Sequence, residues 1–104
     1  MKYFVFKLIP PRKTFAVDMT PAEIELMKLH ALYWSNLMRA KKVLVFGPVA
    51  DPDGPYGIGI VSLEDPSEAS TIADNDPVIS AGAGFESVVT PMASAVLPHM
   101  VAGA

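Results

Sequence analysis

Residues 43–64, VLVFGPVADPDGPYGIGIVSLE, decide the fold. Two apolar runs, residues 43–50 and 58–64, are separated by the loop DPDGPYG, in which prolines, Asp53-Gly54 and a further glycine are crowded together. Such a loop is typical of a hairpin, because proline and glycine supply the backbone angles that tight turns need. We therefore expect two antiparallel strands that are neighbours in one sheet.

A helix is predicted on each side of this hairpin. Upstream, TPAE at residues 20–23 combines a threonine N-cap, a proline at the first helical position and a glutamate at the third. A helix should therefore run over about residues 21–41. Downstream, DPSE at residues 65–68 repeats the pattern and predicts a shorter helix over about residues 66–75.

Two further strands are expected outside the helices, at residues 2–9 and 85–92, where aromatic and β-branched residues are frequent. A polar loop is expected between the first of these strands and Thr20. The order is then β-α-β-β-α-β, and right-handed crossovers place both helices on one face of a four-stranded sheet. The predicted fold class is α+β, with a ferredoxin-like unit. The 104 residues are expected to form a single domain with a core over about residues 2–92 and a short apolar tail over residues 93–104.

The first expected strand is apolar on both of its faces. Its two alternating sets are Phe4, Phe6 and Leu8 on one side and Tyr3, Val5 and Ile9 on the other. The helices cover only one face of the sheet, and a large uncovered apolar face is unusual in a soluble monomer. We therefore expect a symmetric homodimer in which two sheets face each other. The alternative is that the C-terminal tail folds back over the open face.

Composition excludes several classes of function. The net charge is −3 and lysine and arginine form no run, so we expect no binding of nucleic acid. The chain has no cysteine and no apolar run of membrane-spanning length, so we expect a cytoplasmic protein without a membrane partner. The glycines of GPYGIG lie in a hairpin and the two histidines are far apart. We therefore expect neither a cofactor nor a bound transition metal.

One histidine, His30, lies on the apolar side of the first predicted helix, where its neighbours include Met27, Trp34 and Leu37. A histidine in this setting either bonds to a carbonyl in the core or lies beside a cavity, because its ring nitrogens need partners. Tyr33 and Trp34 likewise either belong to the core or line a pocket. The residues alone leave these alternatives open.

Two glycines mark the expected strand after the turn. Gly57 and Gly59 occupy alternate positions, so one face of that strand carries no side chains there. Glycines in strands often mark the close approach of another group or room for a ligand. The alternative is a loop-end glycine followed by an accident of packing.

These elements together resemble a known family. A helix with His30 in the middle of its apolar face, the run VLVFGP ending on Gly47-Pro48, and a second helix that closes on Asp76-Pro77 are similar to the YciI-like (YCII-related) family. The resemblance implies a dimeric α+β barrel built from ferredoxin-like units, as in muconolactone isomerase. It also implies an active site with a histidine–aspartate pair, here His30 and Asp76. Some members resemble dehydrochlorinases that act on chlorinated hydroxyquinols.

The resulting functional hypothesis is a cofactor-free enzyme that moves a proton on a small cyclic organic compound, by isomerisation or by elimination. His30 would act as general acid or base, and Asp76 would hold its tautomer and stabilise its cation. The alternative is a non-catalytic ligand-binding, accessory or regulatory domain. The expected substrate-binding residues are Met27, Tyr33, Trp34, Gly47, Pro48 and Pro77.

Overall fold

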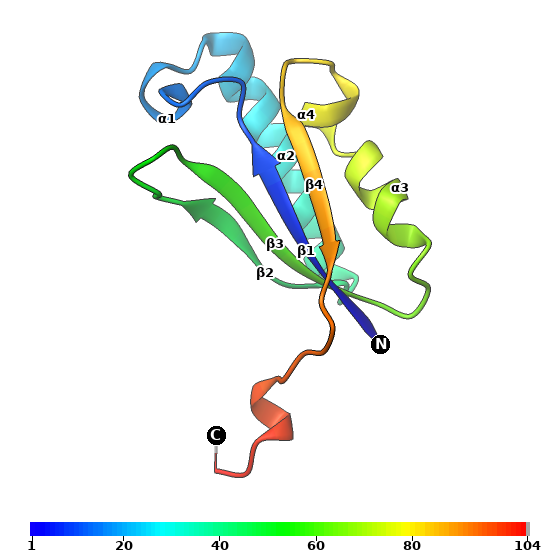
Figure 1. Cartoon of the computed structure of the whole chain (residues 1–104). Coiled ribbons are helices and arrows are strands. Elements are labelled where there is room, and N and C mark those ends of the chain that lie inside the picture. Colours follow the sequence, from blue (N-terminus) through cyan, green and yellow to red (C-terminus); the bar gives the residue numbers. More distant parts are fainter. Residues whose placement is uncertain (104) are drawn as a thin grey trace.

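A computed structural model of the protein describes residues 1–103. Its strands are β1 (Lys2–Ile9), β2 (Val43–Val49), β3 (Tyr56–Leu63) and β4 (Glu86–Pro91). Its helices are α1 (Phe15–Asp18), α2 (Pro21–Arg39), α3 (Glu68–Asp74) and α4 (Pro77–Ser80), followed by the short 3-10 helix η1 (Pro98–Met100). The four strands and the two longer helices follow one another as the sequence predicted (Figure 1).

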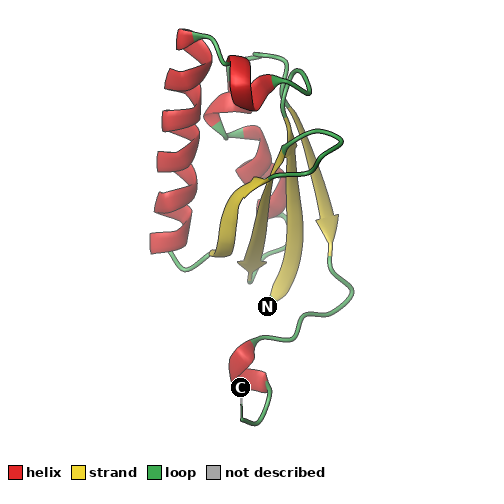
Figure 2. Ribbon diagram, turned by 90° about the vertical axis from the view of Figure 1, so that its left-hand side faces the viewer, coloured by secondary structure: helices red, strands yellow, loops and turns green. Residues whose placement is uncertain are grey.

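The strands form one antiparallel sheet in the order β2-β3-β1-β4. This is the ferredoxin-like arrangement, so the predicted α+β fold class is confirmed. Both α2 and α3 lie on the same face of the sheet (Figure 2). The start signal of α2 is formed as expected, since the Thr20 hydroxyl accepts from the Glu23 backbone N–H while the Glu23 carboxylate accepts from the Thr20 N–H.

The second helix ends within a residue of its expected position, but the role of Asp76-Pro77 differs from the expected one. α3 ends at Asp74, and Asp76-Pro77 does not close it but begins α4. Asp76 is the N-cap of α4, where its carboxylate accepts from the Val78 backbone N–H. Pro77 occupies the first helical position, where its missing N–H has no hydrogen bond to lose.

Two other details differ from the sequence prediction. Gly47-Pro48 does not end the apolar run but lies inside β2, where Gly47 pairs with Ile58 and Pro48 pairs with Gly57. β2 is an edge strand, and an edge strand tolerates a proline because one row of its N–H groups needs no partner. The segment expected to be a polar loop between β1 and α2 contains α1, whose Phe15 is buried.

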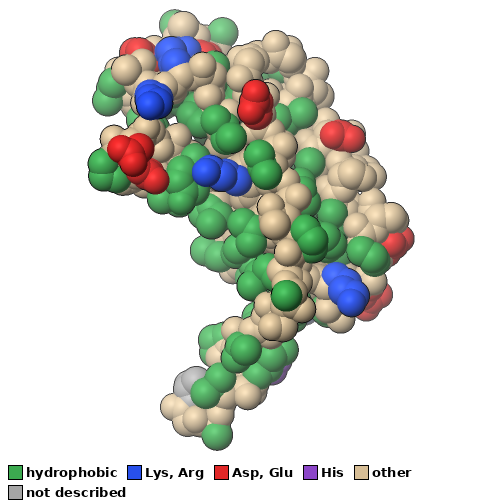
Figure 3. Space-filling model, viewed as in Figure 1, with side chains coloured by type: hydrophobic (Ala, Val, Ile, Leu, Met, Phe, Trp, Pro, Cys, Tyr) green, Lys and Arg blue, Asp and Glu red, His purple; other side chains and the backbone are tan. Residues whose placement is uncertain are grey.

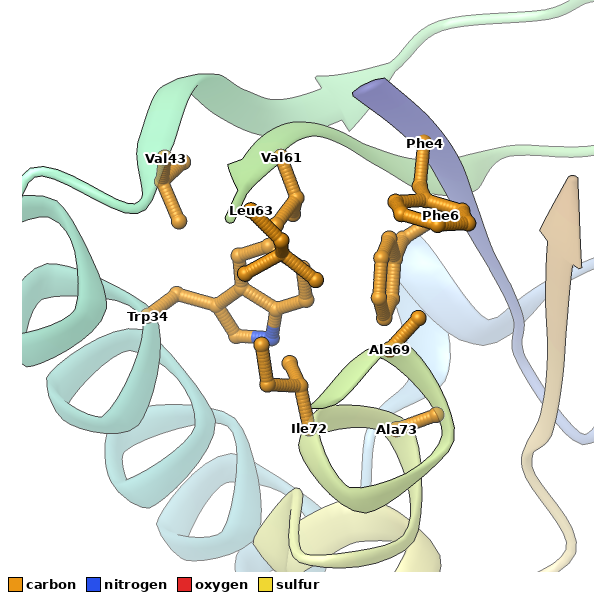
Figure 4. Close-up of a cluster of buried hydrophobic side chains, with 9 residues drawn as sticks. All are labelled: Phe4, Phe6, Trp34, Val43, Val61, Leu63, Ala69, Ile72 and Ala73. Carbon is orange, nitrogen blue, oxygen red and sulfur yellow. The ribbon is translucent and has the colours of Figure 1, made fainter. Parts of the chain in front are cut away.

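The hydrophobic core lies between the sheet and the helices (Figure 4). Its buried members are Phe4, Phe6, Trp34, Val43, Val61, Leu63, Ala69, Ile72 and Ala73. The inward side chains of β1 and β3 alternate along the strands, as the two-residue period of a strand requires. This alternation fixes which face of the sheet receives the helices.

The opposite face of the sheet, here called the open face, carries Tyr3, Val5, Val45, Ile60 and Val88, interrupted by the exposed Lys7 and Thr90. Val45 is 55% exposed and Val88 is 43% exposed. Apolar side chains spread over this face in the space-filling view (Figure 3). The tail up to residue 103 does not cover it, because the chain runs away from the sheet beyond β4, and for these residues the alternative of a tail folded over the open face is wrong. Within residues 1–103, no helix combines the length and the apolar character that crossing a membrane requires.

Candidate active site

A cavity of about 410 Å³ lies between α2 and the inner face of the sheet, beneath α1. Its wall is almost entirely apolar. The lining includes Phe6, Leu8, Phe15, Met27, Ala31, Phe46, Gly57 and Phe85, together with the polar side chains of His30, Trp34 and Asp76. An apolar cavity with a few convergent polar groups is the usual form of a small-molecule site.

His30 and Asp76 meet at the wall of this cavity. The imidazole Nδ1 lies 2.8 Å from Asp76 Oδ2 and 3.0 Å from Oδ1. Both side chains are largely withdrawn from solvent, at 14% exposed for His30 and 5% for Asp76. Low exposure strengthens the electrostatic interaction between them, because water no longer screens it. The structure thus brings together two residues that are 46 positions apart in the sequence.

Three donors converge on the Asp76 carboxylate. Besides the imidazole, Trp34 Nε1 donates to Oδ2 at 2.8 Å and the Val78 backbone N–H donates to Oδ1 at 3.2 Å. Indole and backbone N–H groups can only donate, so the carboxylate serves these partners best as an ionised acceptor. The carboxylate then also accepts a hydrogen bond from the Nδ1–H group of His30. This leaves Nε2 as the ring nitrogen available for chemistry.

His30 Nε2 is accessible. The described residues include no buried side-chain nitrogen or oxygen that lacks a partner. Since Nε2 makes no hydrogen bond to another described residue, it must reach space that a solvent molecule can occupy. An accessible Nε2 beside a fixed Nδ1 is the geometry that a general acid or base requires.

Residues 1–93 match the family model of the YCII-related domain. The chain belongs to the YCII-related family. No curated protein matches its sequence. Among solved structures, this YCII-related chain is similar to the 5-chloro-2-hydroxyhydroquinone dehydrochlorinase of Burkholderia phenoliruptrix AC1100, in complex with 2,5-dihydroxybenzoquinone. The TM-score is 0.60 at 21% identity, over 86% of this chain and 91% of that chain. At this identity the similarity establishes the shared fold.

Four of the expected substrate-binding residues of the YCII-related domain line the cavity: Met27, Trp34, Gly47 and Pro48. Tyr33 does not. Its hydroxyl donates to the Ile72 carbonyl at 2.8 Å, and the pKa of that hydroxyl is raised by burial and, to a smaller extent, by the negative charge of Asp76. Adjacent residues of a helix point about 100° apart, so Trp34 can face the cavity while Tyr33 packs against α3.

Pro77 also lies outside the cavity lining, since it serves as the first residue of α4. Sequence reasoning missed Phe15, Phe46 and Phe85 as wall residues of the YCII-related domain. Phe15 was hidden in a segment expected to be polar, although an isolated phenylalanine within RKTFAVD was a usable signal. Within residues 1–103, no three side chains of histidine, cysteine, aspartate or glutamate gather as metal ligands.

Proposed function

We propose that this chain is a cofactor-free enzyme that transfers a proton on a small cyclic organic compound. The observation that carries the proposal is the contact between His30 and Asp76 at the wall of an apolar cavity of about 410 Å³. A structural relative of the same fold is a dehydrochlorinase that binds a hydroxybenzoquinone. We therefore favour an elimination or an isomerisation on a compact ring.

In an elimination, His30 Nε2 would take a proton from a ring carbon. The electron pair of the broken C–H bond forms the new double bond, and chloride leaves with the electron pair of the C–Cl bond. In an isomerisation the same nitrogen would return the proton to another atom of the ring. Either step makes an imidazolium, and the Asp76 carboxylate would stabilise that charge in a site whose walls are largely apolar.

We also propose that the working unit is a homodimer formed through the open face. Val5, Val45, Ile60 and Val88 lie on that face, and the described tail does not cover it. An apolar sheet face of this kind marks an interaction site in soluble proteins. A second copy presents the same surface, and so two copies complement each other around a two-fold axis.

The test of the enzymatic proposal is turnover of chlorinated hydroxyquinols and small lactones, followed by chloride release and by ultraviolet absorbance. His30→Ala and Asp76→Asn should each lower kcat by about 10²-fold or more, the scale expected for a general acid–base group. The double variant should lose much less than the product of the two losses, because the residues act as a unit.

The matched control is His99→Ala. His99 is the other histidine of the chain and lies exposed in η1, so its removal should leave turnover unchanged. Full turnover by His30→Ala would contradict the proposal. Saturable binding of these compounds without any reaction would favour the alternative of a ligand-binding or regulatory domain.

A further inference from the structure

Besides lining the cavity, Trp34 makes a hydrogen bond to Asp76. Its ring lies between α2 and the sheet and is only 5% exposed (Figure 4). Its Nε1 donates to the same Asp76 oxygen, Oδ2, that faces His30 Nδ1, and both distances are 2.8 Å. The indole and the imidazole therefore share one acceptor, the Asp76 carboxylate, and do not bond to each other.

This hydrogen bond restricts the rotation of the Asp76 carboxylate. The last torsion of an aspartate side chain has a broad energy minimum, so a carboxylate held at one point can turn. Here His30 and Trp34 approach it from α2, while the Val78 N–H approaches it from the first turn of α4. With donors from two elements, both oxygens are held and one oxygen stays directed at His30 Nδ1.

The position of the indole depends in turn on Gly59 of β3. A Cβ added at Gly59 would lie 2.6 Å from Trp34 Cζ3 and 2.9 Å from Cη2, much closer than real contacts allow. Phe6 and Phe46 pair with Gly59 on its two sides, and their rings lie 5.4 Å and 6.1 Å from the indole. The indole thus packs directly on the backbone of β3 between two aromatic walls.

We propose that Trp34 is a positioning residue for His30 and that Gly59 is a glycine because the indole needs its space. In this arrangement the space at Gly59 determines the position of the indole. The indole N–H then orients the Asp76 carboxylate, and the carboxylate fixes the Nδ1–H tautomer of His30. The proposal rests on the proposed function only for its effect on rate. Its effect on the tautomer is measurable without any substrate.

The first test is Trp34→Phe, which keeps an aromatic ring but removes the N–H. At a pH where the imidazole is neutral, ¹⁵N NMR of the histidines should show one Nδ1–H tautomer for His30 in the wild type and a mixture of tautomers in the variant. The kcat should fall on the order of 10-fold, less than for His30→Ala. A merely structural role for Trp34 would not change the tautomer.

The second test is Gly59→Ala, which keeps every hydrogen-bonding side chain and pushes the indole away. Trp34 is the single tryptophan, so its indole N–H gives one NMR resonance, and this resonance should shift in Gly59→Ala. Gly57→Ala is the matched control for that resonance, because an added Cβ there meets Leu8 and not Trp34. The double variant Gly59→Ala, Trp34→Phe should have a kcat only slightly lower than that of Trp34→Phe alone. The smaller ring of phenylalanine leaves room for the added methyl group.

The results separate this inference from the proposed function. If no compound reacts but both variants disturb the His30 tautomer, the positioning role stands and the enzymatic role fails. If the His30 nitrogens keep their wild-type shifts in folded Trp34→Phe and in Gly59→Ala, the positioning role is overturned whatever the turnover. Should Trp34→Phe not fold, Gly59→Ala alone decides, since the same comparison of His30 shifts applies to it.

Discussion

Asp76 has two structural tasks at once. As an N-cap it satisfies a backbone N–H at the start of α4, and as a buried acceptor it satisfies the side chains of His30 and Trp34. The Asp76 residue is only 3% exposed, so water does not readily replace it. A capping residue on the surface needs only one of these bonds, and this difference separates Asp76 from an ordinary helix start.

The loss of stability on replacing Asp76 should therefore depend on whether the new side chain still offers a hydrogen-bond acceptor. Asp76→Ala leaves the N–H groups of His30 and Trp34 without an acceptor and removes the cap, which should lower the free energy of unfolding by about 2–5 kcal/mol. Asp76→Asn keeps an oxygen at the same place and should lower it by less. Urea denaturation of both variants measures the difference, and equal losses would mean that the shared acceptor contributes nothing to folding.

At the scale of elements, α1 is held over the cavity by charged groups. The Arg12 guanidinium donates to the Asp18 carboxylate at 2.8 Å and to both oxygens of Glu23 at 2.7 and 2.9 Å. Glu23 also belongs to the capping box of α2, so these bonds join α1 to the start of the longest helix. Phe15 of α1 packs edge-on against Phe85 at 5.2 Å between ring centroids. This wall of the cavity thus depends on an ion-pair network at the surface.

This network should make the stability of the protein sensitive to acid. The hydrogen bond from Arg12, above all, lowers the pKa of the Glu23 carboxyl from an ordinary value of 4.5 to about 2. A carboxyl group whose pKa is lower in the folded than in the unfolded state stabilises the fold at any pH above its unfolded-state pKa. This stabilisation is lost as the pH falls toward the pKa of the folded state. The melting temperature of the wild type should therefore fall between pH 4.5 and pH 2 more steeply than that of Glu23→Gln.

Glu25→Gln is the control for this measurement. Glu25 pairs with Lys28 on the exposed surface of α2, where both side chains are about 70% exposed, and such pairs contribute little. Its melting temperature should follow the wild type through the same pH range. Parallel curves for the wild type and Glu23→Gln would show that the Arg12 network does not link α1 to α2 in solution.

The elements that the sequence predicted are those with local signals, and the ones it missed lack them. α2 has a capping box and several turns of apolar periodicity, and the β2–β3 hairpin has its turn residues. Helices of four residues, such as α1 and α4, are too short to show a period. Pro77 was understood as the end of a helix because a proline stops one helix and starts another with equal ease.

The candidate site was predictable in part for the same reason. His30 was visible on a helix face, whereas Asp76 was chosen through the resemblance to a family. The hydrogen bond from Trp34 to Asp76 was not predictable, since it depends on how α2 crosses α4 and on the space that Gly59 leaves. Tyr33 was misplaced because the face of a helix alone does not say which neighbour it meets.

At the scale of the whole molecule, the two faces of the sheet differ sharply. The inner face is covered by helices, while the open face presents Tyr3, Val5 and Ile60 beside the exposed Val45 and Val88. The described tail projects away from the sheet, so the described chain leaves this face unshielded. The proposed homodimer removes the apolar surface from water and makes each sheet the inner wall of a shared interior.

The dimer proposal is tested by Val45→Lys. A lysine at this position places an unpaired ammonium group between the two sheets, and burial of an unpaired charge is strongly unfavourable. The wild type should sediment at twice 11.1 kDa at micromolar concentration, and the variant should sediment near 11.1 kDa while circular dichroism shows a folded chain. Val17→Lys is the matched control, because Val17 is an equally apolar and even more exposed valine, at 87%, that lies on α1 away from the sheet. It should remain dimeric. A wild type that sediments at 11.1 kDa would refute the dimer, and a Val45→Lys variant that stays dimeric would place the contact on another surface.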